Sequence, residues 1–123
     1  MKNLMKSLVA AAAAVALFSG CASGGLPERP CEIHGVQYTL APGRTFESVV
    51  VDAAARRRWM AHRLANGTMR CTLLQREHRV VVDVVPAPGG TFGIHLVESN
   101  ISARKYNQWV ENLRREIVFR ANK

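Results

Sequence analysis

The sequence contains no hydrophobic run long enough to cross a membrane as a helix. Its longest apolar run, Leu8 to Phe18, has eleven residues, whereas a spanning helix needs about 20. No RNA- or DNA-binding motif and no internal repeat is present. The histidines are scattered singly, without the spacing of a metal site: His34, His62, His78 and His95. These absences argue against a membrane-spanning protein, a nucleic-acid-binding domain and a metal centre, and the sequence predicts no cofactor.

The N-terminus has the three-part layout of a secretory signal. Two lysines precede the apolar run and two small residues follow it, directly before Cys21. This junction resembles a bacterial lipobox, at which signal peptidase II cuts lipoproteins after the thiol of the cysteine has accepted diacylglycerol. We therefore expect a lipoprotein signal peptide over residues 1–20 and acylation of Cys21. The alternative is an ordinary secretory signal cut near Ala22, which would remove Cys21.

Acylation of Cys21 would anchor the mature protein, because two or more acyl chains hold a protein stably on a bilayer. The next residue is Ala22 rather than aspartate. By resemblance to lipoprotein sorting in enteric-type bacteria, this favours the periplasmic face of the outer membrane. Residues 21–30 contain small and polar residues with glycine and proline, so we predict a flexible tether there. Residues 31–123 are predicted to form a single domain.

Acidic residues are scarce in this chain. Nine Asp and Glu residues stand against seventeen Lys and Arg residues, for a formal charge of +8. Removal of the signal peptide takes away Lys2 and Lys6 and lowers the charge to +6. Nucleic acid is scarce outside the inner membrane, so we expect no nucleic acid partner. The favoured interpretation is that the charge only keeps the domain soluble, and the alternative is an anionic counter-surface such as lipid headgroups or lipopolysaccharide.

Two cysteines remain once Cys21 is acylated. The periplasm is oxidising, so Cys31 and Cys71 are predicted to form a disulfide. In the chain-entropy model such a bridge would stabilise the domain by about 4 kcal/mol. The alternative is that Cys71 is a small buried core residue with a free thiol.

Two segments have the periodicity of amphipathic helices. The first is predicted over about Phe46 to Arg57, with Thr45 as its N-cap and basic residues in its last turn that complement the helix dipole. The second is predicted over about Ala103 to Ala121, after the N-cap Ser102. Its apolar stripe includes Trp109, which we expect to be buried against a sheet.

Three turns in the middle of the chain predict antiparallel strands. Asn66-Gly67 suits a two-residue type I′ hairpin. A second turn near Glu77 and a loop over residues 86–90 would reverse the chain twice more. The registers set by these turns share one apolar face, which a slip of one residue would break. The predicted pairs on this core face are Met60 with Leu73, His62 with Cys71, Cys71 with Val84, and Val82 with Ile94.

The predicted fold is an α+β domain. It consists of a four-stranded antiparallel meander with two helices on one face, in a two-layer sandwich. Ahead of the first helix, Ile33, Val36 and Tyr38 alternate around Gly35. This alternation indicates an additional N-terminal edge strand or an extended arm.

Several short motifs stand out from about Thr45 onward: Trp59, Gly67, Arg76-x-His78, Ser99-Asn100 and Tyr106-Asn107-x-Trp109-Val110-x-x-Leu113. In these motifs the chain resembles a family of small proteobacterial lipoproteins. The family combines a lipobox with a domain of about this size, and the resemblance implies the fold and the location but no mechanism. Related sequences often have glycine where this chain has Arg58, and a small apolar residue where it has Cys71.

The sheet face opposite the helices is a candidate binding surface. If it is open, its apolar residues form an exposed patch ringed by charge, as binding surfaces often do. The alternatives are ordinary β-propensity on a solvated face, or cover by the N-terminal arm. The predicted register sets Val81 opposite His95. The candidate binding residues are Leu74, Val81, Val85, His95 and Val97.

Two clusters have both a structural and a functional interpretation. The arginines at positions 56–58 are expected to serve the helix end, and the alternative is an anion-binding site. Trp59, Tyr106 and Trp109 are expected in the core, and the alternative is a platform on which a ligand stacks.

No catalytic residue is predicted, and we expect no enzyme. Asp83, His95 and Ser99 invite comparison with a catalytic triad. However, the predicted register sets Asp83 opposite Gly93, and Ser99 lacks the sequence of a nucleophile elbow.

The sequence therefore favours a non-catalytic interaction or structural module of the envelope, anchored to the membrane by lipid, with an envelope protein as its expected partner. The alternative is a binder of an anionic or small envelope ligand, such as lipopolysaccharide or peptidoglycan. A pocket lined by converging polar groups would favour the binder. A filled core and a flat outer sheet would favour the module.

Overall fold

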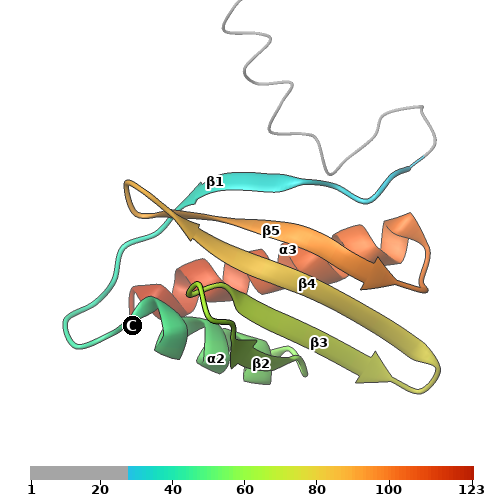
Figure 1. Cartoon of the computed structure of the whole chain (residues 1–123), viewed down its shortest axis with the longest axis horizontal. Helices are drawn as coiled ribbons and strands as arrows, with labels where there is room; N and C mark the ends of the chain where they lie inside the picture. The colour runs from blue at the N-terminus through green and yellow to red at the C-terminus, as the bar shows by residue number, and fades with distance from the viewer. Residues whose placement is uncertain (1–27) are drawn as a thin grey trace, which may run out of the picture.

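The computed structural model describes residues 28–123 as an α+β domain with a five-stranded antiparallel sheet and two helices (Figure 1). The strand order is β1-β5-β4-β3-β2. Cys21, the predicted signal peptide and most of the predicted tether lie outside the described residues. The elements are β1 (Ile33–Gln37), α2 (Phe46–Arg56), β2 (Met60–Arg63), β3 (Met69–Gln75), β4 (His78–Ala87), β5 (Thr91–Ser99) and α3 (Ala103–Ala121).

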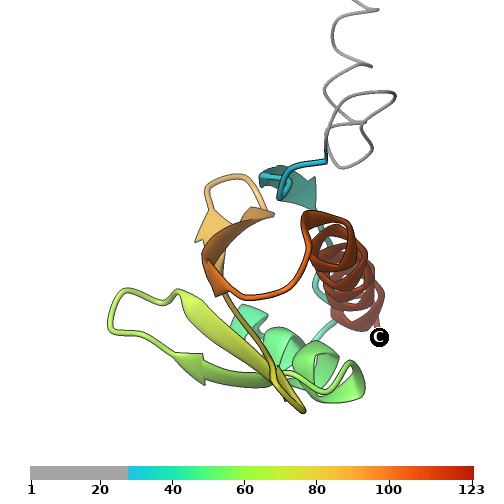
Figure 2. The ribbon, with the colours of Figure 1, turned by 90° about the vertical axis from the view of Figure 1, so that its right-hand side faces the viewer.

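The predicted fold class is confirmed, with one difference in the sheet. Strands β2 to β5 form the expected meander, but the sheet has five strands rather than four, because the segment around Gly35 is an edge strand, β1, paired with β5, and not an extended arm. Seen end on, the sheet curves around both helices, which lie on its concave side (Figure 2). Helix α2 contacts β2 and β3, helix α3 contacts β5, and the two helices contact each other.

Each helix begins after an N-cap residue whose side chain accepts a hydrogen bond from a backbone N–H of the first turn. The Thr45 side chain accepts from the Ser48 N–H while Ser48 Oγ accepts from the Thr45 N–H, which completes a capping box. Ser102 caps α3 by accepting from the Lys105 N–H at 3.2 Å. Each helix then turns one apolar stripe to the sheet. The buried stripe residues are Val49, Val50, Ala53 and Ala54 in α2, and Tyr106, Val110, Leu113, Ile117 and Ala121 in α3.

The first hairpin has a different register from the predicted one. A type I′ turn needs positive φ at both central residues, but of Asn66 and Gly67 only Gly67 has it, with φ of 87°. The Gly67 N–H donates to the Leu64 carbonyl at 3.1 Å, and the Leu64 N–H donates to the Thr68 carbonyl at 2.7 Å. The loop therefore has three residues and contains a bulge, as in hairpins that combine a type I turn with a left-handed glycine.

The extra loop residue shifts the first register by one position. Ala61 rather than His62 lies opposite Cys71, while His62 lies opposite Arg70. Because side chains alternate between the two faces of a strand, this slip moves His62 and Met60 to the outer face. Met60 is accordingly 70% exposed. The prediction that these two residues face the core was wrong.

The other two hairpins are shifted by two positions, so they keep the predicted core face. Cys71 lies opposite Val82 rather than Val84, and Val84 rather than Val82 lies opposite Ile94. All four residues are fully buried. A further irregularity falls between Val81 and Val82 in the pairing of β4 with β5.

The predicted Cys31–Cys71 disulfide is wrong, because Cys71 has a free, buried thiol. Cys31 lies just before β1, and two strands, β5 and β4, separate β1 from β3. At about 4.8 Å per strand, β1 and β3 are about 14 Å apart. A disulfide requires Cα atoms within about 7 Å. The alternative interpretation of Cys71 as a core residue is therefore confirmed, and burial, with a further contribution from Asp83, raises the pKa of its thiol to about 12.

A buried side chain of α3 holds the N-terminal segment against the domain. Asn107 Oδ1 accepts from the Cys31 N–H at 2.8 Å. Its Nδ2 donates to the Arg29 carbonyl at 2.9 Å and to Glu28 Oε2 at 3.2 Å. These bonds position the chain to enter β1 beside β5. The chain is therefore bonded to the folded domain from Glu28 onward.

Candidate functional site

The five predicted binding residues of the outer face do not form one continuous exposed patch. Leu74 is 60% and Val97 is 44% exposed, and Val85 and His95 are half-buried. Val81 is only 3% exposed, so it contributes almost no accessible surface. The predicted pair of Val81 with His95 is also wrong, because Val81 lies opposite Glu98.

A polar belt crosses the middle of this outer face. Arg70 binds Asp83 through two hydrogen bonds, from Nε to Oδ1 at 2.8 Å and from Nη2 to Oδ2 at 2.9 Å. This hydrogen-bonded carboxylate raises the pKa of Arg70. His62 lies opposite Arg70, and His95 lies opposite Asp83 rather than Val81. The belt separates the exposed apolar residues rather than joining them.

The outer face does not assemble a catalytic triad. Asp83 lies opposite His95 and not opposite Gly93 as predicted, but both of its carboxylate oxygens bind Arg70. Ser99 lies four positions beyond His95 on β5, about 13 Å along an extended strand. Its Oγ accepts from the Ile101 N–H at 3.3 Å, in the loop that leads to α3. Within residues 28–123, no group of three potential ligand side chains could hold a metal ion.

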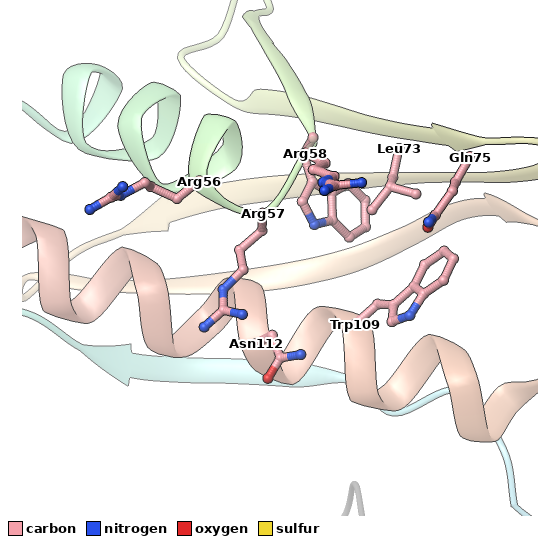
Figure 3. A pocket seen from close by; sticks show the side chains of 8 residues that line it. Arg56, Arg57, Arg58, Leu73, Gln75, Trp109 and Asn112 are labelled. Atoms are coloured by element: carbon pink, nitrogen blue, oxygen red, sulfur yellow. The ribbon is translucent and has the colours of Figure 1, made fainter.

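The structure contains a cleft where the end of α2 meets α3 and β3 (Figure 3). Its volume is about 240 Å³. Three consecutive arginines, the last residue of α2 and the two after it, line one rim, and a tryptophan and an asparagine of α3 form the opposite wall. The lining residues are Arg56, Arg57, Arg58, Trp59, Leu73, Gln75, Trp109 and Asn112.

The backbone at the end of α2 places the arginines. The Trp59 N–H donates to the Ala54 carbonyl at 2.8 Å, and the Arg58 N–H donates to the Ala55 carbonyl at 3.3 Å. This pair of bonds is a Schellman motif, which requires a left-handed residue after the helix cap. Arg58 occupies that position, with φ of 68°. Glycine is usual there, because a side chain in this conformation is strained.

The cleft carries an excess of positive charge. Arg57 Nε lies 3.4 Å from Glu116 Oε1, but Glu116 also accepts a hydrogen bond from Arg120 at 2.9 Å. Arg56 and Arg58 have no carboxylate partner among the described residues. In Figure 3, Arg57 extends toward Asn112 and Arg58 toward Leu73, whereas Arg56 points away from both. Arg58 is therefore the arginine best placed to bind an anion in the cleft.

The aromatic residues of the cleft differ in burial. Trp59 and Tyr106 are buried in the core, as expected. Trp109 is only half-buried, so its predicted burial against the sheet holds in part. One side of Trp109 packs on the core and its ring meets His78 edge-on, at 6.3 Å between ring centroids. The remaining surface of its indole is open to the cleft.

Sequence reasoning noted the arginine run and both tryptophans but did not bring them into one site. The signal that could have joined them was Arg58, which directly follows the predicted first helix at a position where glycine commonly ends a helix. The sequence suggested that Asn107 bonds the Ser99-Asn100 loop, but its side chain binds the segment before β1, which lies far away in the sequence. Comparison with known protein families, curated proteins and solved structures found no match for this chain. Within residues 28–123, no helix is long and apolar enough to span a membrane.

Proposed function

We propose that this chain is a lipid-anchored protein of the bacterial outer membrane, and that its domain is a non-catalytic module binding an anionic envelope ligand. The observation that carries the binding role is the cleft at the end of α2, where Arg58 has no carboxylate partner within the described residues. Guanidinium groups bind carboxylates and phosphates through paired hydrogen bonds. Converging polar groups in a pocket favour a ligand binder over a purely structural module.

The short distance between the proposed lipid anchor and the domain supports a ligand in the envelope. Cys21 follows the lipobox-like junction, and the chain is held against the domain from Glu28 onward. The seven residue-to-residue steps from Cys21 to Glu28 span at most about 25 Å when fully extended. An acylated Cys21 would therefore keep the cleft close to the membrane surface and to the glycans and headgroups found there.

Cosedimentation of the purified mature protein tests this function. The protein is mixed with lipopolysaccharide-containing vesicles, or with purified peptidoglycan, and the bound fraction is measured. Arg58→Gly removes the cleft charge at a position where glycine suits the backbone, so it should lower affinity by about tenfold or more. Arg104→Ala is the matched control, because Arg104 is well exposed in the first turn of α3 and does not line the cleft.

The two variants carry the same change in charge, so nonspecific attraction would weaken both equally. The proposal predicts that only Arg58→Gly binds weakly. Equal losses in the two variants, or a wild-type protein that cosediments with neither material, would contradict a role for the cleft.

A further inference from the structure

The chemistry of the cleft is richer than an anion alone requires. We propose that it binds a single pyranose unit that carries an anionic substituent, either a phosphate or a carboxylate. This inference rests on the proposed function and narrows its ligand class. Four side chains of the cleft supply the contacts: Arg58, Gln75, Trp109 and Asn112.

Arg58 supplies the contact to the anionic substituent. The Schellman motif holds its backbone in the left-handed conformation, and its guanidinium projects over the cleft toward Leu73 (Figure 3). Strained non-glycine conformations cluster at functional sites, which supports a role for the Arg58 side chain. Arg57 lies next to it and contacts Glu116 of α3 at 3.4 Å. This ion pair joins the two walls of the cleft and reduces the reorganisation that binding would require.

Two carboxamides supply contacts suited to hydroxyl groups. The side chains of Gln75 and Asn112 make no hydrogen bond within the described residues, although both line the cleft. A carboxamide offers both a donor and an acceptor, and a hydroxyl group can use both. A bare phosphate would use only the donors and would leave the acceptor oxygens without a purpose. Their pairing with Arg58 therefore favours a hydroxylated anion.

Trp109 supplies an apolar surface for the ring of the ligand. Its indole is half-buried, and the core and His78 hold it in place. A tryptophan face gives a large apolar contact at little cost in conformational entropy, and its N–H remains available as a donor. The C–H face of a pyranose suits such a surface, while its hydroxyls point to the sides. Leu73 contributes further apolar lining to the cleft.

The size of the cleft limits the ligand to one ring. Its volume of about 240 Å³ is below the range of roughly 300–1,000 Å³ that holds drug-sized molecules. A single sugar unit suits this volume, whereas a whole nucleotide or an oligosaccharide would extend beyond it. The cleft would therefore hold one charged unit of a larger envelope glycan.

Isothermal titration of the mature protein with four small probes tests the inference. The probes are N-acetylglucosamine, inorganic phosphate, N-acetylglucosamine 1-phosphate and N-acetylmuramic acid. Both tryptophans of the chain line the cleft, so tryptophan fluorescence gives an independent readout. We expect at least one charged sugar to bind about tenfold or more tightly than either N-acetylglucosamine or phosphate. The preferred probe shows whether the natural source is a phosphorylated or a carboxylated glycan.

Two variants separate the parts of the inference. Arg58→Gly should lower the affinity for the charged sugars about tenfold, toward that of N-acetylglucosamine. Asn112→Leu should weaken binding of all the sugars and weaken inorganic phosphate less, because phosphate loses one donor and keeps Arg58. Circular dichroism of each variant checks that it is folded, and Arg104→Ala again serves as the charge-matched control.

The possible failures are distinguishable. If phosphate binds as tightly as the charged sugars, the cleft binds anions as proposed and the saccharide inference is wrong. If the neutral sugar binds as tightly as the charged ones and Arg58→Gly changes nothing, the anionic function itself is wrong. If the folded protein binds none of the probes, the saccharide inference is overturned, and cosedimentation then decides the broader function.

Discussion

Replacement of Arg58 by glycine should stabilise the domain while it removes the proposed anion contact. Arg58 adopts φ of 68° at the end of α2, where the Schellman motif requires a left-handed residue. Its guanidinium makes no ion pair within the described residues that the change would break. The substitution therefore acts on stability mainly through the backbone.

The size of this effect follows from two opposing terms. A side chain in the left-handed conformation costs about 1–2 kcal/mol. Glycine also raises the conformational entropy of the unfolded chain, which lowers the free energy of unfolding by roughly 0.4–1 kcal/mol. The net increase in the free energy of unfolding is about 0.5–1 kcal/mol. For a domain of this size, this raises the melting temperature by roughly 2–6 °C.

Thermal denaturation followed by circular dichroism measures the effect, with Arg58→Ala as the matched variant. Both substitutions remove the charge, but alanine keeps a side chain at the left-handed position. Arg58→Gly should melt above the wild type, and Arg58→Ala at or below it. If the two variants melt at the same temperature, residue 58 does not have the left-handed conformation and the explanation of the cleft geometry fails.

Four further outcomes are expected. Cys21→Ser should abolish fatty-acid labelling and release the protein from membranes; unchanged membrane partitioning would refute acylation. Because burial raises the Cys71 pKa to about 12, native protein at mildly alkaline pH should leave this thiol unalkylated in peptide mass spectrometry, whereas unfolded protein should react quickly. Asn107→Ala should cost about 2–3 kcal/mol and speed hydrogen exchange in β1, and Asn107→Asp, which keeps the acceptor for the Cys31 N–H but sets an oxygen against Glu28 and the Arg29 carbonyl, should lose at least as much; normal protection of β1 in both would contradict the clamp. Trp109→Ala should cost about 2 kcal/mol, below the 3–5 kcal/mol of a fully buried aromatic, and a larger loss in denaturant titration would place this ring in the core.

The helices could be predicted from the sequence because their determinants are local. Thr45 and Ser102 cap bonds to residues three positions away, and the apolar stripes repeat within single turns. The second helix spans Ala103–Ala121 as predicted, and the first ends at Arg56, one residue before the predicted limit.

The strand registers show where local reasoning begins to fail. The alternation of apolar residues identified the core face of β3, β4 and β5. The register of β2 depended on the backbone conformation of Asn66, which the dipeptide Asn66-Gly67 does not determine by itself. One dihedral angle thus moved Met60 from the predicted core to the surface.

The sequence by itself determined the α+β class, the helices and the apolar face of the meander, because these depend on contacts between near neighbours in the chain. Only the tertiary structure decided the position of β1 beside β5, which separates Cys31 from Cys71 and gives Asn107 its partners. It also decided which residues form the cleft, because Arg58 and Trp109 line one cavity only where α2 packs against α3. Such contacts join segments far apart in the sequence, and their geometry depends on how the whole core packs rather than on any local pattern.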